Sequence, residues 1–338
     1  MSLDPKVRML NLIKTVKRSE RIEPKEDFNA WHERALARLN GLLGLPLERC
    51  SPAFRIEFVD KENPEFDEIR FLFRSEPDVD VAAHLLTPKN IREDKIPLVI
   101  CLQGHSTGMH ISLGRAKYPG DEAVMNGGDR NFALQIVRRG QAALAIDQRA
   151  FGERGGTEKG PACHQPTMQA LLLGQTIVGQ RCWDVSRAID VVAEEFPQID
   201  TDRVAVMGNS GGGTTALFAP AVDERIAAAM PSCYFCGFAD SIGTLYHCEC
   251  NYVPGIINYF YMGDIAGLIA PRPLVIVSGQ KDNIFPIASA KEQFEIAKVY
   301  YERAGTPQNI RHVIGPEGHR FYADLSWPVF DELTGWNK

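Results

Sequence analysis

The stretch Gly208-Asn209-Ser210-Gly211-Gly212 constrains this chain most, because it joins a strand pattern to a helix pattern. The apolar run 203–207 before it is typical of a buried strand, and small helix-compatible residues follow from Thr214 to Ala221. A serine between glycines at such a junction lies on a sharp turn, where flanking side chains would clash. The pattern predicts an exposed Ser210 hydroxyl with a helix N-terminus behind it.

A second copy of the pattern, at residues 104–108, contains Ser106. It also follows an apolar run, 97–102, but the residues after it show no helical period. We therefore interpret this copy as a loop. Because only Ser210 has a helix N-terminus that supplies a backbone N–H to an oxyanion, Ser210 rather than Ser106 is the candidate nucleophile.

A nucleophilic serine needs an imidazole that takes its proton and a carboxylate that orients the imidazole. Downstream of Ser210, the apolar run 273–278 reads as a buried strand and is followed by Asp282. The run 309–314 reads as the next strand and is followed by His319. The sequence therefore predicts Asp282 as the acid and His319 as the base. The remaining histidines considered lie within a strand or away from strand ends: His32, His84, His110, His164 and His312.

Asp147 is the rival acid, because it also ends an apolar run, 142–146. It precedes Ser210, however, whereas the acid of an α/β hydrolase follows the serine. We expect Asp147 to organise the loop after it, with Arg149 or Arg154 as its partner.

An oxyanion hole requires two N–H donors, one of them from the residue after the nucleophile. Gly211 supplies that donor by position. The second is expected from the loop 103–106, with the N–H of His105 as the best candidate. The alternative is that Gly104 simply ends a strand.

With these pieces in place, the chain resembles the serine α/β-hydrolases of the clan that contains dienelactone hydrolases, acetyl xylan esterases and acyl-peptide hydrolases. The resemblance runs from about Ile69 to the C-terminus, and it is carried by residues 103–105, 147–152, 184–190, 208–212, 279–282 and 318–319. The chain is most similar to the bacterial acetyl xylan esterase-like group. It has Gln103 where that group usually has histidine, and Ala150 where the group has glycine.

The resemblance implies a serine carboxylic-ester hydrolase that forms an acyl-enzyme on short-chain esters such as acetylated carbohydrates, without a cofactor. One alternative is a serine peptidase of the acyl-peptide or prolyl type, although residues 1–50 are too few for the propeller that such enzymes carry. The others are a metal-binding protein and a non-catalytic protein with the hydrolase fold.

The order of patterns predicts an α/β-hydrolase fold with a doubly wound, mostly parallel, eight-stranded sheet. Three alternating runs, 54–59, 69–73 and 79–86, predict antiparallel strands. Runs near Leu98, Ala142, Val204, Ile226, Leu274 and Ile310 alternate with helical patterns and predict the parallel part. We expect an N-terminal helical extension over 1–50, with a helix over 24–43, and a catalytic domain over 51–338. Cap-forming insertions are expected at about 105–131, 152–176 and 235–262.

The third insertion combines aromatic residues with cysteines. Its aromatic residues predict a packed cap or a wall that stacks on a sugar ring: Phe235, Phe238, Tyr246, Tyr252, Tyr259, Phe260 and Tyr261. Cys233, Cys236, Cys248 and Cys250 lie close in sequence, with His247 adjacent. This spacing is compatible with zinc. The tight Cys-x-Cys is not the usual zinc knuckle, so we expect reduced structural thiols, no metal and no cofactor.

Composition excludes some partners. The net charge of −6, from 43 acidic and 37 basic residues, would repel nucleic acid. Residues 1–20 are charged and have no apolar core of a signal peptide, and no run approaches the ~20 apolar residues of a membrane span. We expect a cytoplasmic enzyme with a small-molecule ester substrate and no membrane partner. The oligomeric state does not follow from the sequence.

Overall fold

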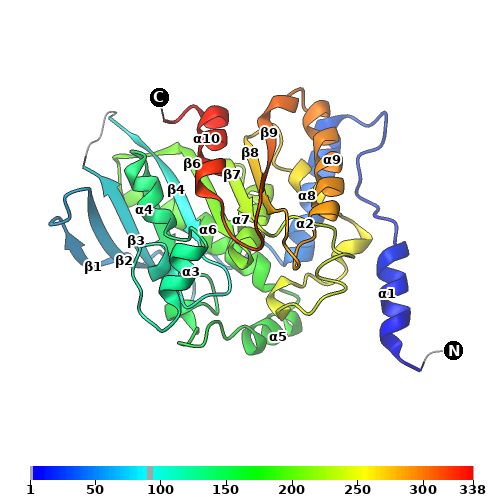
Figure 1. The fold of residues 1–338 in the computed structure, drawn as a ribbon, viewed down its shortest axis with the longest axis horizontal. Coiled ribbons are helices and arrows are strands. Elements are labelled where there is room, and N and C mark those ends of the chain that lie inside the picture. Colours follow the sequence, from blue (N-terminus) through cyan, green and yellow to red (C-terminus); the bar gives the residue numbers. More distant parts are fainter. Residues whose placement is uncertain (1–2, 90–93, 338) are drawn as a thin grey trace.

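A single twisted sheet organises the computed structural model, which describes residues 3–89 and 94–337 (Figure 1). The strands are β1 Arg55–Asp60, β2 Phe66–Glu76, β3 Val79–Pro88, β4 Ile96–Leu102, β5 Ala142–Ile146, β6 Ile199–Asn209, β7 Ile226–Ser232, β8 Leu274–Gly279 and β9 Ile310–Gly315. Their order across the sheet is β1-β2-β3-β5-β4-β6-β7-β8-β9. In the described part of the chain the sheet has nine strands, one more than the predicted eight, because all three antiparallel runs join it.

The helices are α1 Pro5–Thr15, α2 Phe28–Leu43, α3 Asp121–Gly127, α4 Phe132–Arg138, α5 His164–Leu172, α6 Ile177–Glu195, α7 Gly211–Val222, α8 Met262–Gly267, α9 Ile287–Arg303 and α10 Ala323–Thr334. Within the described residues, five short 3-10 helices connect other elements: η1 Met109–Ile111, η2 Gly152–Arg154, η3 Glu249–Asn251, η4 Ile256–Asn258 and η5 Pro307–Asn309. The predicted helix over 24–43 is confirmed as α2, which begins four residues later, after its cap Asp27.

The parallel strands at the centre of the sheet are buried, whereas the antiparallel edge is partly exposed. The strands β1, β2, β3 and β5 pair antiparallel, whereas β5, β4, β6, β7, β8 and β9 pair parallel. Every residue of β4 and of β5 is buried, as expected for strands that are covered on both faces. The edge strand β1 is mostly exposed. The predicted α/β-hydrolase fold is confirmed.

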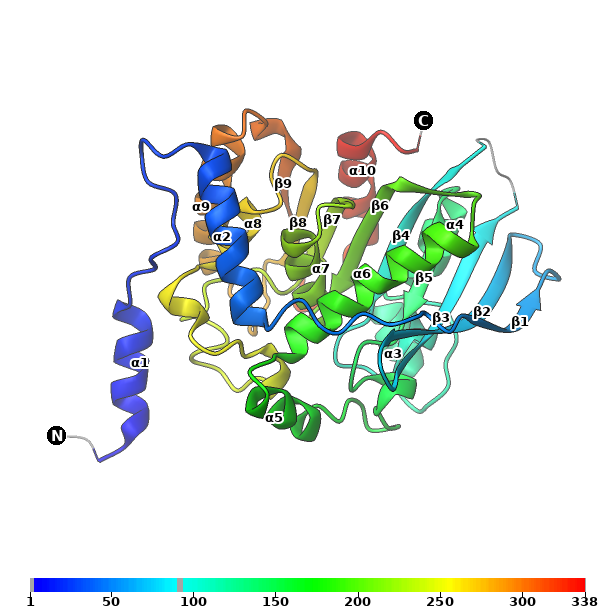
Figure 2. The same cartoon turned by 180° about the vertical axis from the view of Figure 1, so that it is seen from behind.

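Helices cover both faces of the sheet (Figures 1 and 2). On one face α2, α6, α7, α8 and α9 form the larger hydrophobic core with side chains of β2, β3, β4 and β6. On the other face α4 and α10 form a second core around Phe132, Trp327 and Phe330. The sheet therefore lies between two apolar layers.

The N-terminal segment shares the larger core. The helix α2 buries Trp31, Ala35, Leu39 and Leu43 there and ends at Gly44, which has a left-handed conformation. By contrast, α1 buries no side chain and projects from the body (Figures 1 and 2). The division into units 1–50 and 51–338 stays a prediction. Residues 1 and 2 of the first unit and residue 338 of the second unit lie outside the described residues.

The three predicted insertions are long connections with short helices of their own. They contain η1 and α3, then η2 and α5, then η3 and η4. In Figure 1 they lie toward the lower side of the molecule, where the loop after β9 also turns. This is the side at which β6 passes into α7. No helix among the described residues is long and apolar enough to cross a membrane.

A buried ion network fastens the second insertion to α6. Asp184 on α6 is fully buried and accepts hydrogen bonds from Arg149 at 2.9 and 3.0 Å and from Arg154 at 2.6 Å. Arg149 also pairs with Glu76. Burial alone would raise the pKa of Asp184, but the two guanidinium groups outweigh burial and hold this pKa well below its ordinary value. Asp184 is therefore a buried anion.

We expect Asp184→Asn to lower the free energy of unfolding by about 3–5 kcal/mol, because it leaves buried guanidinium groups without their counter-charge. Urea denaturation at pH 7 measures this loss. The control is Glu332→Gln on the exposed pair with Arg311, where little change is expected. Equal effects of the two substitutions would contradict the prediction.

Candidate active site

Ser210 lies on the sharp turn between β6 and α7. Its φ of 58° and ψ of −120° are uncommon for a residue with a side chain. The amide of Ser210 donates to the carbonyl oxygen of Ser232 on β7 at 2.8 Å, which holds the turn against the sheet. A Cβ on Gly208 would lie 2.5 Å from the backbone of Gly212, so the turn excludes a side chain there. The predicted strand-to-helix turn at Ser210 is confirmed, and its residue is half-buried rather than exposed.

The loop after β4 presses against this turn. A Cβ on Gly104 would lie 2.9 Å from the Ser210 Cβ and 3.2 Å from the Gly211 nitrogen, so only glycine permits the approach. Among the described residues, the amides of Gly211 and His105 donate to no protein acceptor. The two N–H groups are therefore free for another acceptor near Ser210, although their role at an oxyanion stays a prediction.

Asp282 and His319 form a hydrogen-bonded pair, with Asp282 Oδ2 2.8 Å from His319 Nδ1. The other carboxylate oxygen accepts from the amides of Ile284 at 2.8 Å and Phe285 at 3.0 Å. Burial would raise the pKa of Asp282, but the hydrogen bond to His319 and these amides outweigh burial and lower it. The Phe285 ring stacks on the His319 ring at 5.8 Å. The imidazole is thus oriented by an ionised carboxylate.

The strand ends explain how these groups come to one side of the sheet. Asn209, which precedes Ser210, pairs with Ser232, and Gly279 pairs with Gly315 across parallel strands. The loops that carry Asp282 and His319 therefore leave the same edge as the Ser210 turn. No hydrogen bond joins Ser210 to His319 in the described chain, and such contacts are often long without substrate. The three catalytic roles remain predictions.

Two further residues approach this site that sequence reasoning did not place there. Cys233 follows β7, and its sulfur lies within 4.8 Å of ligand atoms of Asp282 and His319. Burial and the charge of Asp282 raise the pKa of Cys233 to about 12. His247, from the third insertion, lies 5.3 Å from the Phe285 ring. Burial, then the nearby charges of His105 and His319, lower its pKa.

Gln148 joins the loop after β4 to α7. Its amide nitrogen donates to the carbonyl oxygen of Gln103 at 2.6 Å, and its oxygen accepts from Thr215 on α7 at 2.5 Å. Gln148 is buried. The only sequence signal for this link between the loop and the helix was the position of Gln148 next to the strand-end residue Asp147.

Asp147 organises the loops as predicted, and its carboxylate is held by backbone amides. Its carboxylate accepts from the amide of Met109 at 2.7 Å and from the amide of Glu153 at 2.9 Å. Of the two predicted partners, Arg154 donates to the backbone carbonyl oxygen of Asp147 at 3.2 Å, while the guanidinium groups of both Arg149 and Arg154 pair with Asp184. Burial raises the pKa of Asp147 to about 6.

Ser106 lies in a loop, as predicted, and its buried hydroxyl has no hydrogen-bond partner among the described residues. Burial lowers the pKa of His312, which lies on β9 beside the Ser278 hydroxyl, to about 4. The remaining histidines have hydrogen-bond partners elsewhere: His32 with the carbonyl oxygen of Leu268, His84 with Glu68, His110 with Asp121 and His164 with Glu249.

The cysteines assemble differently from the set that the spacing indicated. Cys233 lies beside the Asp282–His319 pair, and the Cys236 sulfur lies near the carbonyl oxygen of Gly237. Cys248 and Cys250 instead meet Cys163 and His105. Proximity in sequence was therefore misleading here. All eight cysteines are free thiols in the structure.

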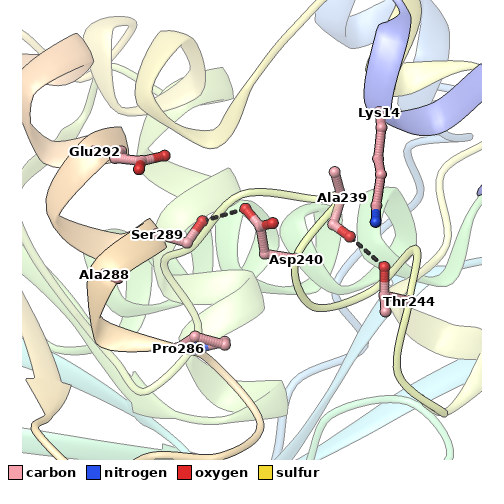
Figure 3. Close-up of a pocket in the computed structure, with 8 residues that line it drawn as sticks. All are labelled: Lys14, Ala239, Asp240, Thr244, Pro286, Ala288, Ser289 and Glu292. Atoms are coloured by element: carbon pink, nitrogen blue, oxygen red, sulfur yellow. Dashed lines mark hydrogen bonds between the residues drawn. The ribbon is translucent and has the colours of Figure 1, made fainter. Parts of the chain in front are cut away.

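A hollow of ≈ 340 Å³ lies between α1, the third insertion and α9 (Figure 3). Lys14, Asp240 and Glu292 line it, and Ser289 donates to Asp240 at 2.5 Å. None of the predicted catalytic residues lines this hollow. It is separate from the turn at Ser210.

The fold and the strand-to-helix turn at Ser210 define an α/β hydrolase. Comparison with known proteins agrees, since the chain belongs to the Abhydrolase family, whose model matches residues 6–313. YtaP of Bacillus subtilis (strain 168) is 27% identical over 244 residues, which cover 70% of this chain and 77% of YtaP. The predicted resemblance to serine α/β-hydrolases is thereby confirmed.

Two solved structures have similar folds. A putative acetyl xylan esterase from Bacteroides fragilis NCTC 9343 superposes with a TM-score of 0.80 at 16% identity, covering 99% of this chain and 90% of that one. A glucuronoyl esterase from Solibacter usitatus superposes with a TM-score of 0.69 at 15% identity, covering 96% and 99%. At these identities the likeness concerns the fold.

We expect the stability contribution of Asp147 to decrease between pH 4 and pH 7. An unfolded aspartate ionises near pH 3.8, whereas the folded carboxyl keeps its proton up to about pH 6, so the folded state binds more protons in this window. The free energy of unfolding of the wild type, relative to Asp147→Asn, should be about 2 kcal/mol greater at pH 4 than at pH 7. Urea denaturation at both pH values measures this difference. A difference that does not change with pH would contradict the prediction.

Proposed function

We propose that this protein is a serine carboxylic-ester hydrolase that forms an acyl-enzyme on short-chain esters, with acetylated carbohydrates as the leading class. The observation that carries the proposal is the strained turn at Ser210, which shares a sheet edge with an imidazole oriented by a buried carboxylate. Strain at a residue with positive φ is typical of functional positions, because the surrounding fold must maintain it.

In the proposed reaction the Ser210 hydroxyl attacks the ester carbonyl carbon while His319 Nε2 takes its proton. The tetrahedral intermediate collapses, and His319 returns the proton to the leaving alcohol. Water then repeats the sequence on the acyl-enzyme and releases the acid. Asp282 holds His319 in the tautomer whose Nε2 faces the serine and stabilises the imidazolium that forms.

The negative oxygen of the intermediate would be bound by the N–H groups of Gly211 and His105. Both are free of protein acceptors in the described chain, and the N-terminus of α7 adds a favourable dipole at this point. Removing one such donor from a serine hydrolase typically costs about 10²–10³ in kcat. Gln148 would act as a positioning residue, since it holds the carbonyl oxygen of Gln103 just before this loop.

The proposed alcohol is a sugar. One solved structure reported above carries the name of an acetyl xylan esterase, in whose substrate the carbohydrate is the alcohol, whereas a glucuronoyl ester carries its sugar on the acyl side. In the third insertion Phe235, Phe238 and Phe260 are buried, as in a packed cap. Tyr246 and Tyr252 are exposed. Tyr246 precedes His247, whose ring lies near the site, so an exposed ring is available to stack on a sugar.

We expect Ser210→Ala to reduce hydrolysis of p-nitrophenyl acetate by at least about 10⁴-fold, because no other group forms the acyl-enzyme. The wild type should prefer acetate to butyrate and octanoate and should release acetate from acetylated xylo-oligosaccharides. Ser106→Ala is the matched control and should keep its activity within a few-fold. Ester hydrolysis that survives Ser210→Ala would remove Ser210 from the mechanism, and cleavage of an aminoacyl p-nitroanilide would favour a peptidase.

His319→Ala and His312→Ala separate the catalytic histidine from the structural one. We expect the first to reduce kcat by about 10⁴-fold, because the base is lost, and also to lower the melting temperature, because buried Asp282 loses its partner. The second should leave kcat within a few-fold but reduce the melting temperature, because half-buried His312 loses its hydrogen bond with the Ser278 hydroxyl. Steady-state kinetics and thermal unfolding measure both. A larger loss of kcat in His312→Ala than in His319→Ala would contradict the assignment.

A further inference from the structure

Four metal-ligating side chains from three separate segments meet next to the Ser210 turn. They are His105 from the loop after β4, Cys163 before α5, and Cys248 and Cys250 at η3. Their ligand atoms all lie within 4.8 Å of one another, and Cys250 Sγ lies 3.3 Å from His105 Nε2. Three thiols and one imidazole nitrogen therefore converge on one point.

This donor set matches a closed tetrahedral zinc site. Zinc binds thiolate sulfur at about 2.3 Å and imidazole nitrogen at about 2.0–2.1 Å, and Cys₃His is one of its structural combinations. In a tetrahedron with these bond lengths, neighbouring ligand atoms lie about 3.5–3.8 Å apart. Thiolate-rich sets also exclude magnesium and calcium, which prefer oxygen. The four ligand atoms, which lie within 4.8 Å of one another, therefore need only small side-chain movements to reach these distances.

Arg181 supplies the second, independent observation. Its side chain is fully buried, and no carboxylate pairs with it among the described residues. Its guanidinium points instead to Cys250 Sγ at 3.4 Å and Cys163 Sγ at 3.7 Å, and it donates to the carbonyl oxygen of Arg149 at 2.8 Å. A buried cation requires a counter-charge. Three neutral thiols provide none, whereas three thiolates around one divalent ion carry a net charge of −1.

The surroundings hold the imidazole in a suitable orientation. The ring of His105 lies 5.0 Å from the ring of Phe151, and Arg181 lies 4.1 Å above that same Phe151 ring. A Cβ on Gly211 would lie 2.9 Å from His105 Nδ1, so that nitrogen faces the turn and Nε2 faces the cysteines.

We propose that Cys163, Cys248, Cys250 and His105 bind one structural Zn²⁺, with Arg181 as the neighbouring cation that balances its thiolates. The ion would link the first, second and third insertions, which have no continuous secondary structure in common. It has no role in the chemical step. If the proposed function holds, the ion also fixes the backbone of His105, whose N–H belongs to the proposed oxyanion hole.

Metal analysis of the full-length protein, expressed with zinc in the medium, tests the proposal directly. Elemental analysis should find one zinc per chain, and cobalt added to the zinc-free protein should give thiolate-to-cobalt charge-transfer bands of a tetrahedral site. Removal of zinc by a chelator should lower the melting temperature, because binding free energy contributes to folding. Iron or copper at this stoichiometry would overturn the assignment of zinc.

Cysteine variants locate the site. Cys163→Ser and Cys250→Ser should each lower the zinc content at least 10-fold, whereas Cys236→Ser, on a buried cysteine outside the cluster, should retain it. Ser210→Ala should bind zinc normally, so failure of the esterase proposal and failure of this one are distinguishable. The proposal is overturned by wild-type protein that neither contains nor saturably binds zinc. A native Cys163–Cys248 disulfide in non-reducing peptide mapping would also overturn it.

Discussion

The close approach of two backbone segments at Ser210 is the constraint on which the site depends. The loop after β4 and the start of α7 touch at Gly104 and Gly211, where a side chain on Gly104 would collide with the serine turn. At this contact Ser210 has a positive φ, and the amides of Gly211 and His105 have no protein acceptor among the described residues. Strain in the backbone and open donors thus occur together where the adjacent parallel strands β4 and β6 end.

Buried charges then hold the loops around this turn. Asp147 binds the amides of the first and second insertions, and Asp184 binds two arginines of the loop after β5. Each arrangement places a charge where water is absent, so each must be fully hydrogen-bonded to be tolerated. Arg181 follows the same rule, and the proposed thiolate-bound zinc satisfies it. The loops are therefore organised by electrostatic pairing more than by secondary structure.

The fold was predictable because its signals are local. Continuous apolar runs identified the buried strands, and alternating runs identified the antiparallel ones. All nine strands of the sheet therefore have a visible sequence pattern, although we predicted a sheet of eight strands. The structure also has the strand-to-helix turn at Ser210 and a hydrogen bond between Asp282 and His319, because strand-end positions in a parallel sheet converge on one edge, while the catalytic roles stay predictions. The helix α1 was not predicted, since none of its side chains is buried and its pattern carries little information.

The sequence by itself determined the strand-to-helix turn, the order of the strand-end residues and the class of fold. These depend on backbone sterics and hydrophobic period, which neighbouring residues specify. Only the tertiary structure decided that Arg149 turns to Asp184, that Cys233 lies beside His319, and that Cys248 and Cys250 meet Cys163 and His105. Those contacts join insertions distant in the chain, and their geometry depends on how the whole sheet and its loops pack.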